Sequence, residues 1–262
     1  MDNLRPLQTQ RLTAHGTEPV KEAPTVQAEY KQKIIKDKFG TEYCYVPKMN
    51  FYFSENNTIE VIHAPFYIAK YPITVAQFHH FLKESSYNYN QLHIQMMNRI
   101  SNTPDCPATP VSWWDAKYYI RWIRYVTGEY YSLPMQTEWE AACRANDARI
   151  HPWGDDPPTD LHASYSRHSP KLTTDIVGTH PLGNSPFGCA DMVGNVWEWC
   201  LDTTDDETMA YCRGGSCNDP AQKCTSTSSI TFPTNIQTNF VGFRPIYLPG
   251  EMFEEYKIAM NS

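Results

Sequence analysis

The feature that most constrains how this chain folds is an aromatic, glycine-bounded segment, Asp191–Ser216. It opens with DMVGNVWEWC, in which Trp197 and Trp199 alternate with Val196 and Glu198. That alternation is the two-residue period of a β-strand, so one face of the strand is aromatic and the other can hold polar chemistry. Glycines stand before the strand and in the closing RGGS, which indicates sharp bends or close backbone approaches that a Cβ would block.

Composition excludes several classes of function. The chain has 262 residues, 41% hydrophobic and 19% charged, enough for a sizeable core. Its net charge of -7 argues against nucleic acid or an anionic membrane as a partner, because both attract basic surfaces. No run approaches the roughly 20 apolar residues of a membrane span, and the N-terminus lacks the apolar core of a secretory signal. We therefore expect a cytoplasmic protein whose eight cysteines are reduced thiols.

The N-terminal third is expected to begin as a polar tail and to continue as β-strands. Residues 1–40 are polar, with a short basic helix predicted over Tyr30–Phe39. Alternating aromatic and β-branched residues in EYCYVPKMNFYFS predict a hairpin around Pro47, and a second extended run covers Ile59–Ile68. The stretch Tyr87–Pro110 is either a long excursion or an inserted helix.

Three helices are predicted from capping boxes, in which a side chain at the N-cap and one three residues later each accept a backbone N–H of the first turn. The pairs are Thr74 with Gln77, Ser112 with Asp115, and Thr137 with Glu140, and Gly128 ends the second helix. After HPWGDD (residues 151–156), turn residues dominate as far as residue 190, and we expect no helix in this stretch. Residues 249–262 are expected to form a short helix or a tail.

The order of motifs resembles the formylglycine-generating enzyme and sulfatase-modifying-factor family. It runs YPITVAQF, PVSWWDAKYYIRWI, LPMQTEWEAACR, HPWGD, GNSPFGCADMVGNVWEW, RGGS and VGFRP over about residues 42–247. The resemblance implies an α+β domain of modified C-type-lectin type, poor in regular secondary structure, over residues 41–248. The family includes oxidases, non-haem iron enzymes and binding proteins, so the fold alone does not imply catalysis.

Copper-dependent members of the family carry cysteines at the third and eighth positions after the serine of GGS, where soft thiolates hold Cu(I). Counted from Ser216, these positions hold Asp219 and Cys224, so the pair is incomplete. Cys217 is a candidate substitute, but in an extended segment it lies about 6–7 Å from the position of the missing ligand. We expect no copper, and the catalytic candidates are Ser216, Cys217 and Cys224. The iron-dependent relatives take histidines from a preceding helical domain, which the polar tail here does not resemble.

The resemblance also implies a structural calcium site, for which oxygen ligands in a tight loop are suited. The corresponding residues here are Asp191, Gly194, Val196 and Glu198. Its occupancy stays open, because free calcium is low in the cytoplasm. A second calcium site of the family would fall on Ser164 and Asp175, although Ser164 replaces an asparagine.

In binding members of the family, the region after GGS displays the contact surface. Here TSTSSITFPTNIQTNF is uncharged and rich in hydroxyls, which suits adaptable hydrogen bonding around apolar anchors. The predicted binding surface comprises Asn218, Asp219, Thr225, Ser228, Ile230, Phe232 and Asn235. Arg244 in VGFRP is expected to be structural.

We therefore predict a non-catalytic, protein-binding or regulatory member of this family that holds another protein through residues 216–240. One alternative is an oxygen-dependent oxidoreductase with an altered thiol site that uses copper or iron. A carbohydrate-binding module is the other alternative, by analogy of fold.

Overall fold

The computed structural model describes residues 32–55, 58–167 and 171–260, and it has the mixed α+β architecture expected from the sequence. The larger sheet is antiparallel and has the strand order β1-β2-β5-β11-β6. Its strands are β1 (Ile34–Lys36), β2 (Glu42–Val46), β5 (Phe66–Ala69), β11 (Ile246–Leu248) and β6 (Tyr130–Ser132). The sheet thus joins the first strands of the domain to its last.

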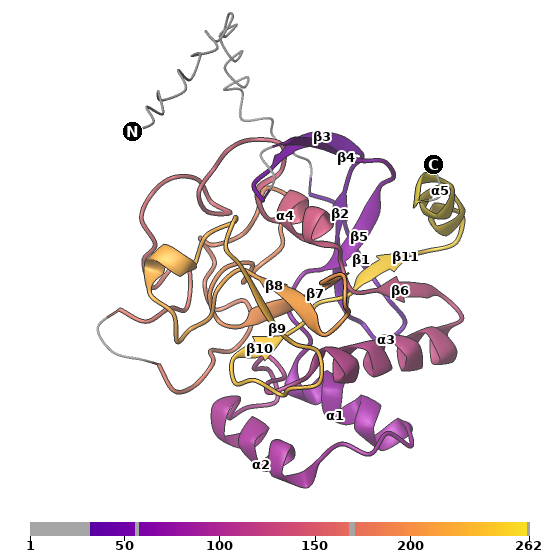
Figure 1. The fold of residues 1–262 in the computed structure, drawn as a ribbon, viewed down its shortest axis with the longest axis vertical. Coiled ribbons are helices and arrows are strands. Elements are labelled where there is room, and N and C mark those ends of the chain that lie inside the picture. The colour runs from indigo at the N-terminus through magenta and orange to yellow at the C-terminus, as the bar shows by residue number, and fades with distance from the viewer. Residues whose placement is uncertain (1–31, 56–57, 168–170, 261–262) are drawn as a thin grey trace, which may run out of the picture.

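A second sheet, of order β10-β7-β8-β9, carries the aromatic segment. Its strands are β10 (Val241–Gly242), β7 (Trp197–Thr203), β8 (Met209–Arg213) and β9 (Ser229–Pro233), and β10 pairs with β7 in parallel. A separate two-stranded ladder is formed by β3 (Met49–Phe53) and β4 (Thr58–Ile62). Figure 1 shows this ladder and the helices α1–α3 at opposite ends of the molecule, with β7–β10 between them.

The helices are α1 (Val75–Glu84), α2 (Gln91–Ile100), α3 (Trp113–Thr127), α4 (Gln136–Arg144) and α5 (Glu251–Met260), with a short 3-10 turn at Ala221–Lys223. The capping boxes predicted at the starts of α1 and α3 are both present. Gly128 ends α3 in the left-handed conformation, with φ 74°. The stretch 87–110 holds an inserted helix, α2. Among the described residues, no helix is both long and apolar enough to cross a membrane.

Two predictions about the first strands are wrong. The segment predicted as a basic helix contains β1, because Ile34–Lys36 gains backbone pairing along one edge of β2 and Ile35 packs against the core. The predicted hairpin around Pro47 does not form either. The edges of β2 are taken by β1 and β5, so β3 pairs with β4 instead.

The third capping box is displaced by two residues from its predicted position. Helix α4 begins at Gln136, and the side chain of Glu138 accepts the backbone N–H of Met135 at 2.7 Å. Glu140 does not cap the helix, because its carboxylate forms buried ion pairs with Arg144 and Arg213.

The aromatic strand lies at the centre of the core, as its sequence predicts. Trp197 and Trp199 face the largest of three hydrophobic clusters among the described residues, together with Phe243 and residues of α1 and α3. The intervening Glu198 is fully buried on the other side of β7, where Trp139 of α4 contacts it. The described residues from 145 to 196 contain no helix, so irregular loops and α4 together cover the polar side of the strand.

Candidate functional site

The RGGS turn after β8 is held against the loop before β7 by close backbone approach. Gly214 and Gly215 have φ of 96° and 79°, which only glycine adopts readily. A Cβ on Gly214 would lie 2.5 Å from the carbonyl oxygen of Met192. The carbonyl of Gly214 accepts the N–H of Gly194 at 3.0 Å. The two glycine motifs, far apart in the sequence, therefore form one backbone junction.

Asp219, which the family resemblance places at the position of a copper-binding cysteine, is tied into this junction. Its Oδ2 atom accepts the indole N–H of Trp197 at 2.8 Å, the hydroxyl of Ser216 at 2.5 Å and the backbone N–H of Ser216 at 3.2 Å. The carboxylate thus joins the aromatic strand to the RGGS turn. A carboxylate is a hard oxygen donor and its Oδ2 is already occupied, so it does not fit the soft thiolate role that Cu(I) requires.

The two neighbouring thiols are buried. Burial raises the pKa of both Cys217 and Cys224 to about 12, so each stays protonated near neutral pH. The Cys224 thiol lies 3.7 Å from the carbonyl oxygen of Ser216, and Cys217 packs with Ile100 and Phe240. Together with Asp219, these side chains do not fit a Cu(I) site. The structure therefore gives neither cysteine the electropositive, accessible surroundings of a reactive thiol.

Arg244 is structural, as predicted from VGFRP. Its Nε and Nη2 atoms donate to the two carboxylate oxygens of Glu198 at 2.6 and 2.7 Å, and both side chains are fully buried. The remaining donors reach the backbone carbonyls of Ala69, Lys70, Ala190 and Asp191. This arginine therefore joins the larger sheet, the loop before β7 and β7 itself.

The proposed calcium residues lie close to this arginine. Glu198 already binds Arg244 with both oxygens and Trp139 with one, so its side chain does not fit the role of a calcium ligand in this arrangement. Asp191 is buried and accepts the N–H of Gly178 at 2.6 Å. Gly194 and Val196 are also buried, and a Cβ on Gly194 would lie 2.2 Å from the carbonyl of Ser164. Across the described chain, no group of three or more His, Cys, Asp or Glu could hold a metal.

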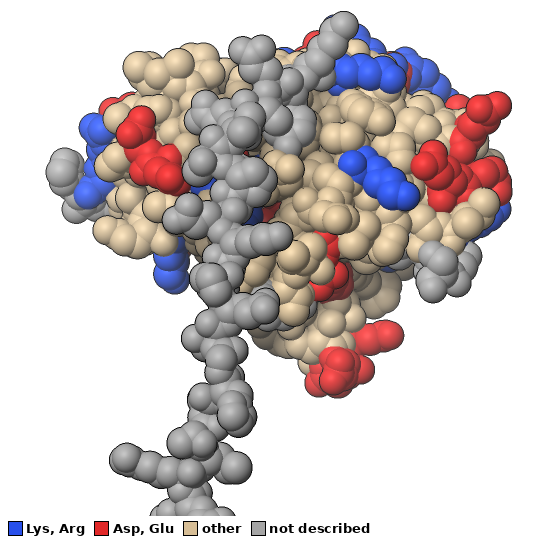
Figure 2. All heavy atoms as spheres, turned by 90° about the horizontal axis from the view of Figure 1, so that it is seen from above, with Lys and Arg blue, Asp and Glu red and all other residues tan. Residues whose placement is uncertain are grey.

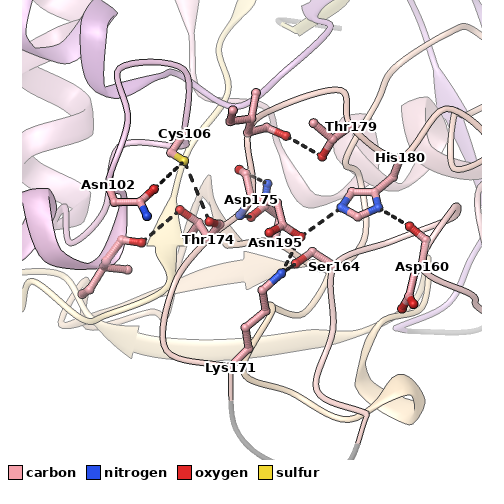
Figure 3. Close-up of polar contacts among 12 residues, drawn as sticks. Asn102, Cys106, Asp160, Ser164, Lys171, Thr174, Asp175, Thr179, His180 and Asn195 are labelled. Carbon is pink, nitrogen blue, oxygen red and sulfur yellow. Dashed lines mark hydrogen bonds and ion pairs between the residues drawn. The ribbon is translucent and has the colours of Figure 1, made fainter.

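Figure 3 shows an ionic cluster beside this junction. The ammonium of Lys171 lies 2.5 Å from Oδ2 of Asp175 and donates to the Ser164 hydroxyl at 3.0 Å. His180 contacts the same carboxylate oxygen at 3.2 Å through Nε2, and its Nδ1 lies 2.7 Å from the carbonyl of Asp160. The residues suggested as a second calcium site are thus brought together, but around a cation that the chain itself supplies.

The sequence did not single out Lys171 or His180 for this cluster. Neither lies in a motif with ligand spacing, and their contacts depend on how an irregular loop folds back on itself. The cluster is connected to the RGGS turn through Asn195, whose side chain exchanges two hydrogen bonds with the backbone of Asp175. The carbonyl of Asn195 accepts the N–H of Cys217 at 3.0 Å.

The seven residues of the predicted binding surface differ in how exposed they are. Asn218 and Asn235 are exposed, whereas the other five predicted residues are half-buried. Ile230 and Phe232 pack against the core, with the Phe232 ring edge-to-face on Trp199 at 6.1 Å. These two residues therefore serve the core more than an outer surface. Elsewhere, Figure 2 shows a face where charges of both signs are scattered among uncharged side chains.

Comparison with known proteins identifies relatives with several activities. The family model described as "Sulfatase-modifying factor enzyme 1-like domain" matches residues 36–247. Hercynine oxygenase of Mycobacterium tuberculosis is 36% identical over 99 residues, covering 36% of this chain and 21% of that protein. Inactive C-alpha-formylglycine-generating enzyme 2 of Bos taurus is 33% identical over 125 residues, covering 44% of this chain and 40% of that protein. The chain thus matches less than half the length of these curated relatives.

Solved structures agree on the fold. PvdO from Pseudomonas aeruginosa aligns with a TM-score of 0.70 at 22% identity, covering 84% of this chain and 99% of that one. CarF aligns with a TM-score of 0.61 at 19% identity, covering 79% of this chain and 98% of that one. At these identities the likeness extends to the fold and no further.

Proposed function

Because this chain belongs to the family of the sulfatase-modifying factor enzyme 1-like domain, we propose that it is a non-catalytic member that binds another protein through residues 216–240. The observation that carries the proposal is the environment of Asp219. Its carboxylate replaces one thiolate of the copper pair and accepts hydrogen bonds from Trp197 and Ser216. Asp219 therefore stabilises the fold around the RGGS turn, and the copper site of the family lacks one of its two thiolates here.

The state of the remaining thiol supports the same conclusion. Cys224 is fully buried, and burial raises its pKa to about 12. A thiol that stays protonated is a poor nucleophile near neutral pH, and a single thiol without a second thiolate is an incomplete Cu(I) site. A relative named as inactive is also found among the family members that this chain resembles.

Copper chemistry is tested by equilibrating the purified protein with Cu(I) in competition with a chromogenic chelator. We expect no stoichiometric copper binding, and no oxygen consumption with a cysteine-containing peptide. The variant Asp219→Cys restores the second thiol, so we expect it to bind Cu(I) more tightly than the parent protein. Stoichiometric copper together with peptide oxidation by the parent protein would overturn the proposal in favour of an oxidoreductase.

Partner binding is tested by placing a photoreactive amino acid at Asn235, which is exposed within residues 216–240. We expect a discrete crosslinked protein when the labelled chain is irradiated in its native cell. The matched control carries the same group at Tyr125, which is 88% exposed on α3. Equal crosslinking from both positions, or none from Asn235, would contradict the assignment of this surface.

Calcium binding at residues 191–198 stays a prediction that rests on the family resemblance. The side chain of Glu198 does not fit, so a calcium ion here would depend on Asp191 and on backbone carbonyls. Such an ion would raise the melting temperature of chelator-treated protein when CaCl2 is added, and Asp191→Asn would remove the increase. An unchanged melting temperature in the parent protein would eliminate the site.

A further inference from the structure

A pocket with a buried arginine lies on the face of strands β8 and β9 that packs partly against Trp139 of α4 and Phe53 of β3. In their antiparallel register Arg213 lies opposite Ser229 and Tyr211 opposite Thr231, so these four side chains share one face. Cys212 packs in the core from the other face. These four residues line a cavity of about 460 Å³ together with Ser54 and others.

The guanidinium of Arg213 is left short of acceptors. Its side chain is fully buried, and its Nη2 atom reaches Glu140 and, at 3.4 Å, the carbonyl of Ser226. Its Nε and Nη1 atoms are buried and have no hydrogen-bond partner among the described residues. Since unpaired buried donors cost free energy, this arrangement favours an acceptor that comes from outside the chain.

The charged groups in direct contact with Arg213 also favour an acidic ligand. Glu140 pairs with Arg213 through one oxygen and with Arg144 through the other, at 2.6 Å for the second pair. Two guanidinium groups therefore share one carboxylate. The rings of Phe53 and Trp139 lie 5.8 and 5.7 Å from the Arg213 guanidinium carbon, and they favour the cation without supplying a second negative charge.

We propose that this pocket binds a carboxylate side chain, Asp or Glu, of the protein partner. Once the Arg213 side chain turns toward the pocket, the carboxylate accepts its free N–H groups, and it takes further hydrogen bonds from hydroxyls such as Thr231 and Tyr211. A single negative charge is favoured over a dianion, because Glu55 also lines the pocket. This inference rests on the proposed function, since the β9 wall belongs to residues 216–240, and it specifies that the partner presents an acidic residue.

The test follows the arginine Nε–H resonances of the full chain by 1H–15N NMR, with Arg213→Lys used to assign the signal. Sodium acetate and the capped peptide Gly-Glu-Gly should each shift the Arg213 signal saturably, and Gly-Gln-Gly should not. Inorganic phosphate should bind more weakly than acetate. No saturable shift with acetate, or stronger binding of phosphate, would overturn the proposal.

A second variant does not touch the buried arginine. Ser229→Asp places a carboxylate opposite Arg213, so we expect it to weaken acetate binding about tenfold, or about 1.4 kcal/mol. The control Asn235→Asp adds the same charge at an exposed position outside the pocket, and acetate binding should be unchanged. If the two variants weakened acetate binding equally, acetate would not bind in this pocket. Because these titrations involve neither copper nor oxygen, a positive copper assay would reject the proposed function and leave the acetate result standing.

Discussion

At the scale of single residues, the cluster around Asp175 gives the domain a pH-dependent component of stability. Burial disfavours the charged form of His180, but its hydrogen bonds to Asp175 and to the Asp160 carbonyl outweigh burial and raise its pKa. For Asp175, burial acts in the opposite direction, but the hydrogen bonds from His180 and Lys171 lower the pKa below its ordinary value. Each charged form therefore supports the other.

The signs of these two shifts define a pH window. The raised pKa of His180 contributes stability that is fully present below the unfolded-state value of about 6.5 and is lost as pH rises through the folded value. The lowered pKa of Asp175 contributes stability that is present above about 3.9 and is lost as pH falls. Urea unfolding from pH 5 to 8 should show this loss, and His180→Gln should remove it. If the free energy of unfolding fell as steeply with pH in the variant as in the parent protein, His180 would not be the source of this loss.

Single residues also show which parts of the site could be predicted from the sequence. Counting positions after RGGS predicts that Asp219 stands where the family carries a thiolate, and VGFRP correctly predicts a structural Arg244. The ion pair between Lys171 and Asp175 could not be predicted, because it forms within an irregular loop that has no periodic pattern. The partner of Arg244, Glu198, lies 46 residues away, and only the tertiary fold brings the two together.

At the scale of elements, the start of α3 depends on one hydroxyl. The Ser112 side chain accepts the N–H of Asp115 at 3.1 Å and donates to its Oδ2 at 2.7 Å. The same carboxylate accepts Tyr87 and Gln237 from outside the helix, at 2.5 and 2.9 Å. The cap therefore fixes both the helix and two loops that cover it.

Replacing this hydroxyl should destabilise the domain measurably. We expect Ser112→Ala to lower the free energy of unfolding by about 0.5–2 kcal/mol, the usual range for loss of an N-cap. Ser86 is exposed, so Ser86→Ala should change it by less than about 0.5 kcal/mol. Urea unfolding measures both effects through the shift in midpoint, provided that the free energy of unfolding depends on urea concentration with the same slope in each variant. Equal midpoints for the two variants would show that the cap does not contribute to stability.

Elements differ in how well the sequence predicts them, and the reason is the range of the contacts that form them. The boxes at Thr74 and Ser112 involve residues three positions apart, so local sequence is sufficient. Strand pairing is non-local. Strand β2 pairs with β5, more than 20 residues later, and β5 pairs with β11 at the end of the domain. A hairpin predicted from adjacent strands fails wherever both edges are already taken.

At the scale of the whole molecule, the cysteines lie in the interior, and five of them belong to one hydrophobic cluster. All eight are free and buried. Cys212 lies in one hydrophobic cluster and Cys217 in another, and a third contains Cys44, Cys143, Cys189, Cys200 and Cys224. Exposing them together therefore requires the domain to open as a unit.

This distribution predicts a thiol reactivity that follows global unfolding. Burial raises the pKa of Cys143, Cys217 and Cys224 to about 12, so neither access nor thiolate character favours reaction of these three thiols in the native state. The hydrogen bond with Cys44 lowers the pKa of Cys189, but this thiol is fully buried and so protected by lack of access. With a thiol-reactive disulfide reagent, native protein should react slowly, and all eight thiols should react rapidly in guanidinium chloride. The native rate should rise with urea in parallel with unfolding followed by tryptophan fluorescence. A thiol that reacts rapidly in the absence of denaturant would reveal a local opening, and mass mapping to Cys217 or Cys224 would revive the redox alternative.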